Sequence, residues 1–134
     1  MMTMKNKIFT PLALLMLVVM TISISFTAIK KKKPVLRHVV SFQFKEEVTP
    51  ERRAQAVKDF LDLKNRIPEI IKFEGGENIS VEGHDKGFTH CYVLTFENEE
   101  GRNIYLPHPA HLEVAKKNKP LMKDLFVVDY WGEE

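Results

Sequence analysis

Val35 to Lys45 read VLRHVVSFQFK, and the alternation of side chains in this stretch predicts the first element of the fold. One face of the extended chain carries Leu36, His38, Val40, Phe42 and Phe44. The other face carries Arg37, Ser41, Gln43 and Lys45. A period of two residues is typical of a strand that is buried on one side. We therefore expect a β-strand whose apolar face packs against a core.

A helix is predicted directly after this strand. Thr49 suits the N-cap position, and Pro50 suits the first helical position, where a missing N–H is harmless. Apolar residues then recur at steps of three and four residues as far as Pro68, which ends the pattern. Beyond it, the pair Gly75-Gly76 predicts a turn and residues 77–82 predict a short strand.

The second half of the chain repeats the alternation of strand and helix. Phe88–Phe96 predicts a strand, Asn98 suits the N-cap of a helix that runs towards Leu106, helical pieces follow Pro109, and residues 126–131 predict a last strand. The order β-α-β-β-α-β is that of a ferredoxin-like α+β unit. Because both clear strands have a strongly apolar side, we expect a homodimer that forms through the sheet.

An apolar run precedes this domain. Residues 8–29 carry no charge, and a helix of that length reaches about 33 Å, enough to cross a bilayer core. Lysines flank the run on both sides, at 5, 7 and 30–33. A cleaved signal peptide and an uncleaved transmembrane helix both fit this pattern, whereas a core helix would need a polar face. We expect residues 1–33 to export the domain at 34–134, as a periplasmic or secreted protein, or to anchor it to a membrane.

Charge excludes one class of partner. The whole chain carries +2, but residues 34–134 hold 14 basic and 18 acidic residues, a net charge of −4. An acidic domain without a basic stripe is unsuited to nucleic acids, because their binding depends on neutralised phosphates. Cys91 is the single cysteine, so no internal disulfide and no thiolate metal cage can form. The sequence contains no cofactor motif, and we assign no cofactor.

Four of the five histidines lie where a solvated side chain is not expected. His38 and His90 share the parity of the apolar residues in their strands, and His108 and His111 lie in the segment YLPHPAH, residues 105–111, where prolines fix the backbone. This clustering predicts a pocket lined by imidazoles. A neutral imidazole can remove a proton between two carbonyls, and the phenol of this segment can donate to the resulting enolate oxygen.

Each candidate also has a structural interpretation. A histidine on the apolar face of a strand is often a hydrogen-bonded core residue, and His108, between two prolines, suits a helix cap. Asp129 in the last strand can orient a histidine ring through its Nδ1–H, or it can face solvent. Three converging histidines can bind zinc, but the spacing offers no helical H-x-x-x-H pair, so we assign no metal.

The elements and motifs together resemble the stress-responsive A/B barrel (Dabb) family over about residues 35–131. The resemblance rests on Leu36-Arg37-His38, Gly87-Phe88-Thr89-His90, Tyr105-Leu106-Pro107-His108-Pro109-Ala110-His111 and Val127-Val128-Asp129-Tyr130. It implies a dimeric α/β barrel, in which two ferredoxin-like subunits close their sheets around a shared core and each keeps its own pocket. The chain departs from the family at Gly101, where larger residues are usual, and in its apolar N-terminal extension.

The family includes plant polyketide cyclases, which perform an intramolecular aldol condensation. By resemblance, His111 would be the general base and Tyr105 would hold the substrate carbonyl. His38, His90 and Asp129 match family positions that line or support the pocket, and we expect these residues and His108 to bind the ligand. The expected ligand is a small apolar or polyketide-like molecule. Most family members have no assigned reaction, so two functions stay open: a histidine-lined binding module of unassigned activity, and a cyclase-like lyase.

Overall fold

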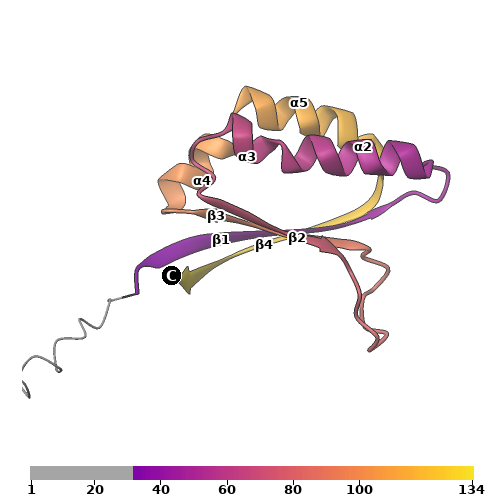
Figure 1. Ribbon diagram of the computed structural model, residues 1–134, viewed down its shortest axis with the longest axis horizontal. Coiled ribbons are helices and arrows are strands. Elements are labelled where there is room, and N and C mark those ends of the chain that lie inside the picture. Colours follow the sequence, from indigo (N-terminus) through magenta and orange to yellow (C-terminus); the bar gives the residue numbers. More distant parts are fainter. Residues whose placement is uncertain (1–31) are drawn as a thin grey trace, which may run out of the picture. The chain divides into compact units, whose positions relative to one another are not determined.

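Four antiparallel strands, with helices on one face, make up residues 32–134, the part of the chain that the computed structural model describes (Figure 1). The strands are β1 (Pro34–Phe44), β2 (Lys72–Glu77), β3 (His90–Phe96) and β4 (Met122–Glu133). The helices are α2 (Pro50–Leu61), α3 (Leu63–Arg66), α4 (Glu99–Tyr105) and α5 (Pro109–Asn118), followed by the 3₁₀ turn η1 (Lys119–Leu121). The strands lie in the order β2-β3-β1-β4. The predicted ferredoxin-like unit is confirmed.

The expected signal peptide or transmembrane helix, residues 8–29, lies outside the described residues. Between residues 32 and 134, no helix has the length and apolar character that a membrane span requires. The role of residues 1–33 therefore stays a prediction.

The apolar face of β1 packs beneath the helices. Leu36, Val40, Phe42 and Phe44 belong to one buried core with residues of α2, α4 and α5. This apolar face was our reason to expect a dimer, but in the structure helices of the same chain cover it. A two-layer α+β unit buries the more apolar side of its sheet against its own helices, so the parity pattern alone does not reveal what the other side contacts.

The opposite face of the sheet has an apolar area of its own. Phe126, Val128 and Tyr130 of β4 are 52%, 43% and 50% exposed, and their β1 partners in register are Ser41, Val39 and Arg37. We call these three β4 side chains the outer patch. In Figure 1 the helices of residues 32–134 all lie on the other side of the sheet, so none of these helices covers the patch.

The predicted turn at Gly75-Gly76 is wrong, and so is the strand predicted for residues 77–82. Both glycines lie inside β2, and the chain beyond Glu77 is a loop. Gly75 has φ +135°, and a Cβ there would lie 2.2 Å from the carbonyl oxygen of Cys91 and 2.6 Å from Cα of Tyr92. Glycine is required here because β3 approaches β2 closely, and such a glycine resembles a turn signal in the sequence.

Both predicted helix starts are confirmed. The Oγ1 of Thr49 accepts the N–H of Arg52 at 3.3 Å, and the Oδ1 of Asn98 accepts the N–H of Gly101 at 3.0 Å. The second cap fixes the first residue of α4. The helix ends six residues later at Tyr105, whose side chain is buried in the core.

Candidate functional site

A cavity of about 310 Å³ lies between α5 and the strands β1 and β4. Its apolar lining includes Val40, Phe60, Val114, Met122, Leu125 and Val127. Its polar lining includes His38, Tyr105, His111 and Asn118. A concave, mostly apolar site with a few converging polar groups is typical of small-molecule binding, and this volume is at the small end of that range.

The first turn of α5 brings His111 to this cavity. The Nδ1 of His108 accepts the N–H of Ala110 at 3.2 Å, and Pro109 occupies the first helical position. His108 is therefore the N-cap of α5, and it is not among the residues that line the cavity. His111 follows one turn later and does line it.

One ring nitrogen of His111 is free to act on a ligand. Its Nδ1–H donates to the carbonyl oxygen of Leu106 at 2.8 Å, so the lone pair of the neutral ring is on Nε2. Burial lowers the pKa of His111, and the hydrogen bond to Leu106 partly opposes this effect. The ring is therefore neutral at pH 7, which is the state that a general base needs.

Tyr105 lies next to both imidazoles of the cavity. Its ring centroid is 4.3 Å from that of His111 and 5.7 Å from that of His38. Burial raises the pKa of Tyr105, so the phenol keeps its proton and can donate it in a hydrogen bond. The cavity thus places a hydrogen-bond donor, the phenol of Tyr105, beside the acceptor nitrogen of His111.

Strand register explains the place of Asp129. It pairs directly with His38 across β1 and β4, and the Nδ1–H of His38 donates to its Oδ1 at 2.6 Å. The other carboxylate oxygen of Asp129 pairs with the guanidinium of Arg102 on α4. The sequence did not indicate Arg102. In the sequence, Arg102 lies one helical turn before Tyr105. That position does not predict a contact with Asp129 on β4.

The structure places His90 away from this group. It pairs with Phe42, four residues along β1 from His38, which corresponds to about 13 Å along the strand. Its ring stacks on Phe42 at 5.1 Å between centroids, and its Nδ1 lies 2.9 Å from the Oγ1 of Thr89. His90 lines two other hollows but not the cavity of His111.

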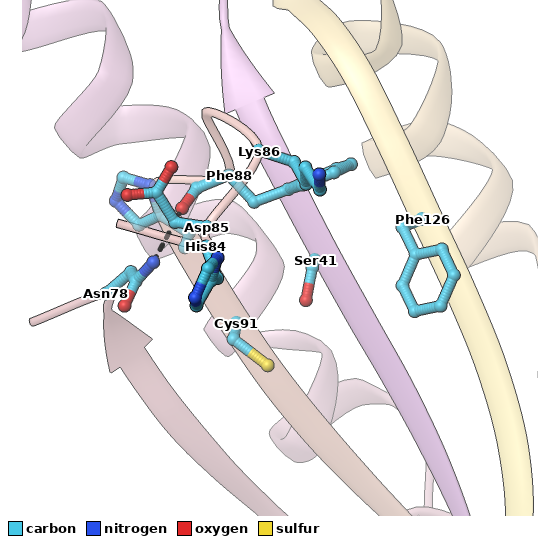
Figure 2. Close-up of a pocket in the computed structure, with 9 residues that line it drawn as sticks. Ser41, Asn78, His84, Asp85, Lys86, Phe88, Cys91 and Phe126 are labelled. Carbon is cyan, nitrogen blue, oxygen red and sulfur yellow. Dashed lines mark hydrogen bonds between the residues drawn. The ribbon is translucent and has the colours of Figure 1, made fainter. Parts of the chain in front are cut away.

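One of those hollows, of about 410 Å³, lies on the face of the sheet opposite the helices (Figure 2). Its floor is Ser41, Cys91 and Phe126, from three adjacent strands. Its rim is the loop between β2 and β3, where Asn78 donates to the carbonyl of Phe88 at 3.0 Å. Some polar groups of the loop therefore form hydrogen bonds that stabilise the loop itself. Across residues 32–134, no three His, Cys, Asp or Glu side chains are grouped so that they could hold a metal ion.

Comparison with known proteins places this geometry in a family. The family model described as Stress responsive A/B Barrel Domain matches residues 36–132. The stress-response A/B barrel domain-containing protein HS1 of Arabidopsis thaliana is 33% identical over 75% of this chain and 93% of its own length. Olivetolic acid cyclase of Cannabis sativa is 27% identical over 71% of this chain and 94% of its own length.

Solved structures have the same fold. Hydroxynitrile lyase from Passiflora edulis matches with a TM-score of 0.70 and 28% identity, over 75% of this chain and 94% of that chain. A dimeric ferredoxin-like protein from Jannaschia sp. matches with a TM-score of 0.63 and 21% identity, over 72% of this chain and 97% of that chain, and supports the fold alone. With its fold, its motifs and a family match over nearly all of residues 32–134, the chain belongs to the stress-responsive A/B barrel domain family.

Proposed function

We propose that the cavity beside α5 binds a small, largely apolar molecule that carries a carbonyl group. The observation that carries this proposal is the arrangement of His38, Tyr105 and His111 on one mostly apolar cavity. The phenol of Tyr105 would donate to the carbonyl oxygen, and the apolar part of the ligand would pack against residues such as Val127. The likeness to olivetolic acid cyclase and to hydroxynitrile lyase supports a small-molecule site.

A second candidate function is lyase or cyclase chemistry at the same cavity. The specific observation in its favour is His111, which is neutral and has an available Nε2 beside the phenol of Tyr105. The Nε2 would take a proton from the carbon next to the carbonyl, and the electron pair of that C–H bond would move towards the oxygen. Tyr105 would stabilise the enolate by donating to this oxygen. The enolate carbon would then form a bond to a second carbonyl carbon of the same ligand, and the alkoxide formed there would take the proton held by His111.

The test combines capture with turnover. Full-length protein is incubated with a metabolite extract, the retained compounds are identified by mass spectrometry, and each is then assayed for conversion. We expect His111→Ala to lose 10²–10⁴-fold in rate, about the contribution of a general base. His84→Ala, a histidine of the β2–β3 loop, should keep the wild-type rate. Capture without turnover would reject catalysis and leave binding, whereas equal rates for His111→Ala and wild type would remove His111 from the reaction.

We also propose that the protein is a homodimer that buries the outer patch. Three large side chains that are about half exposed on one sheet face favour a protein partner. The Jannaschia sp. protein, whose fold is similar, is described as dimeric. Light scattering on the full-length protein tests the proposal, and a monodisperse monomer at micromolar concentration would reject it.

Residues 1–33 form the basis of a proposal about location. We propose that they export the domain or hold it at a membrane, because residues 8–29 are free of charge and flanked by lysines. Cell fractionation with N-terminal sequencing tests this. A mature protein that begins beyond the apolar run indicates a cleaved signal, and a full-length protein in the membrane fraction indicates an anchor. A full-length protein free in the cytosol would reject both.

A further inference from the structure

We propose that Asn118 accepts a hydrogen bond from a hydroxyl group of the ligand in the cavity beside α5. The ligand is then an elongated molecule, with its carbonyl at one end and its hydroxyl at the other. This role of Asn118 rests on the proposed function, because it concerns the same ligand. Asn118 is the last residue of α5, and its side chain is 3% exposed.

The two ends of the Asn118 amide have different surroundings. The Nδ2 donates to the carbonyl oxygen of Ala56 on α2 at 2.9 Å. A carbonyl oxygen only accepts hydrogen bonds, so this contact fixes which end of the amide faces α2. The Oδ1 is therefore at the opposite end, where it is buried without a hydrogen-bond partner among residues 32–134.

A buried acceptor without a partner is unusual, because it has lost its hydration and gained no bond in exchange. Asn118 also lines the cavity. The next residue, Lys119, lines the cavity too, but its side chain is exposed and does not pair with this oxygen. A donor on a bound ligand supplies the hydrogen bond that the chain does not.

The position of Asn118 on α5 sets the shape of the ligand. His111, Val114, Ala115 and Asn118 all line the cavity, and their spacing places them on one face of the helix. Seven residues separate the first from the last, which is roughly 10 Å along the axis. Tyr105, the donor for the carbonyl, lies beside His111. The carbonyl and the hydroxyl therefore bind at opposite ends of the cavity, with apolar side chains between them.

Two ketones of equal size serve as probes. One is methyl octyl ketone, and the other has a hydroxyl in place of the terminal methyl group of the octyl chain. Calorimetry on full-length protein measures the affinity for each. We expect wild type to bind the two with similar affinity, and Asn118→Leu to bind the hydroxyl ketone about tenfold or more weakly than the methyl ketone. Leucine is branched like asparagine but offers no acceptor.

The variant should fold, because Ala56 lies within α2 and its carbonyl also accepts a helical N–H. Asn65→Leu is the matched control, since Asn65 is exposed on α3 and does not line the cavity, and it should keep both affinities. The ratio of the two affinities separates ligand binding from a structural role of Asn118. Looser packing would weaken both ketones alike.

The outcomes separate this inference from the proposed function. An equal ratio in Asn118→Leu and wild type would overturn the role of Asn118 and leave a carbonyl-binding cavity. If Asn118→Leu does not fold, wild type alone decides, because a hydroxyl ketone that binds it about tenfold or more weakly than the methyl ketone contradicts an acceptor at that end. Binding of neither ketone to wild type would reject the proposed function together with this role.

Discussion

Burial of His90 makes the stability of the domain sensitive to mild acid. The ring packs against Phe42, Phe44 and Tyr92, and loss of hydration there lowers the pKa of His90. In the unfolded chain a histidine titrates near pH 6.5, so below that pH the unfolded state binds a proton that the folded state does not. The free energy of unfolding is therefore highest above about pH 6.5 and falls as the pH drops. His111, whose pKa is also lowered, adds to the effect.

We expect His90→Gln to weaken this acid sensitivity, because a neutral amide binds no proton in either state. Thermal unfolding is measured between pH 7.5 and 5, and the decrease in Tm over this range should be smaller for His90→Gln than for wild type. His84→Gln is the control, since His84 lies exposed in the β2–β3 loop and should leave the decrease unchanged. An equal decrease for wild type and His90→Gln would show that another group is responsible.

The adjacent glycines of β2 offer a matched pair of substitutions. We expect Gly75→Ala to destabilise the domain by about 2 kcal/mol or more, because its φ is +135° and its Cβ would overlap the backbone of β3. Gly76→Ala meets nothing within 4 Å and should change stability by less than about 0.5 kcal/mol. Chemical denaturation of both variants measures the difference. Similar values for the two would contradict the close approach of β2 and β3.

At the scale of elements, α4 contains Gly101, which lowers the stability of the helix although no neighbouring atom requires a glycine there. A Cβ at Gly101 would lie 3.6 Å or more from its neighbours, which is ordinary contact. We expect Gly101→Ala to raise the free energy of unfolding by about 0.5–1 kcal/mol, because alanine restricts the unfolded chain and favours the helix. Chemical denaturation checks this. A loss of stability would mean that the Phe96 side chain, the nearest neighbour, cannot accommodate the methyl group.

The elements also show which parts of the fold were predictable. Alternation predicted β1 and β3, and capping residues predicted the starts of α2 and α4, because these signals are local. The strand β2 was not predictable from local sequence. Gly75 is required by the close approach of the neighbouring strand β3, and the residues around it do not reveal that contact. At the site, the short segment from Tyr105 to His111 was enough to predict their proximity. The separation of His38 from His90 depends on strand register, which no local pattern specifies.

At the scale of the whole molecule, the outer patch lies on the face of the sheet opposite the helices of residues 32–134. The helix-covered face has its core within one chain, whereas Phe126, Val128 and Tyr130 are about half exposed on the other. Exposed apolar side chains that lie together on one strand commonly mark an interface. A second copy of the chain would bury them face to face, which is the arrangement that closes a dimeric α/β barrel.

Replacing Phe126 with aspartate tests this face-to-face arrangement. The control is the same substitution at an equally exposed residue outside the patch. Phe126 and Leu112 are 52% and 53% exposed, but Phe126 lies in the outer patch and Leu112 lies on α5. We expect Phe126→Asp to convert the dimer to a monomer at micromolar concentration, because two copies of the patch would then bring buried like charges together. Leu112→Asp should stay dimeric. Light scattering gives the mass of each variant, and Tm shows that each is folded. A dimer that survives Phe126→Asp would place the interface elsewhere on the chain.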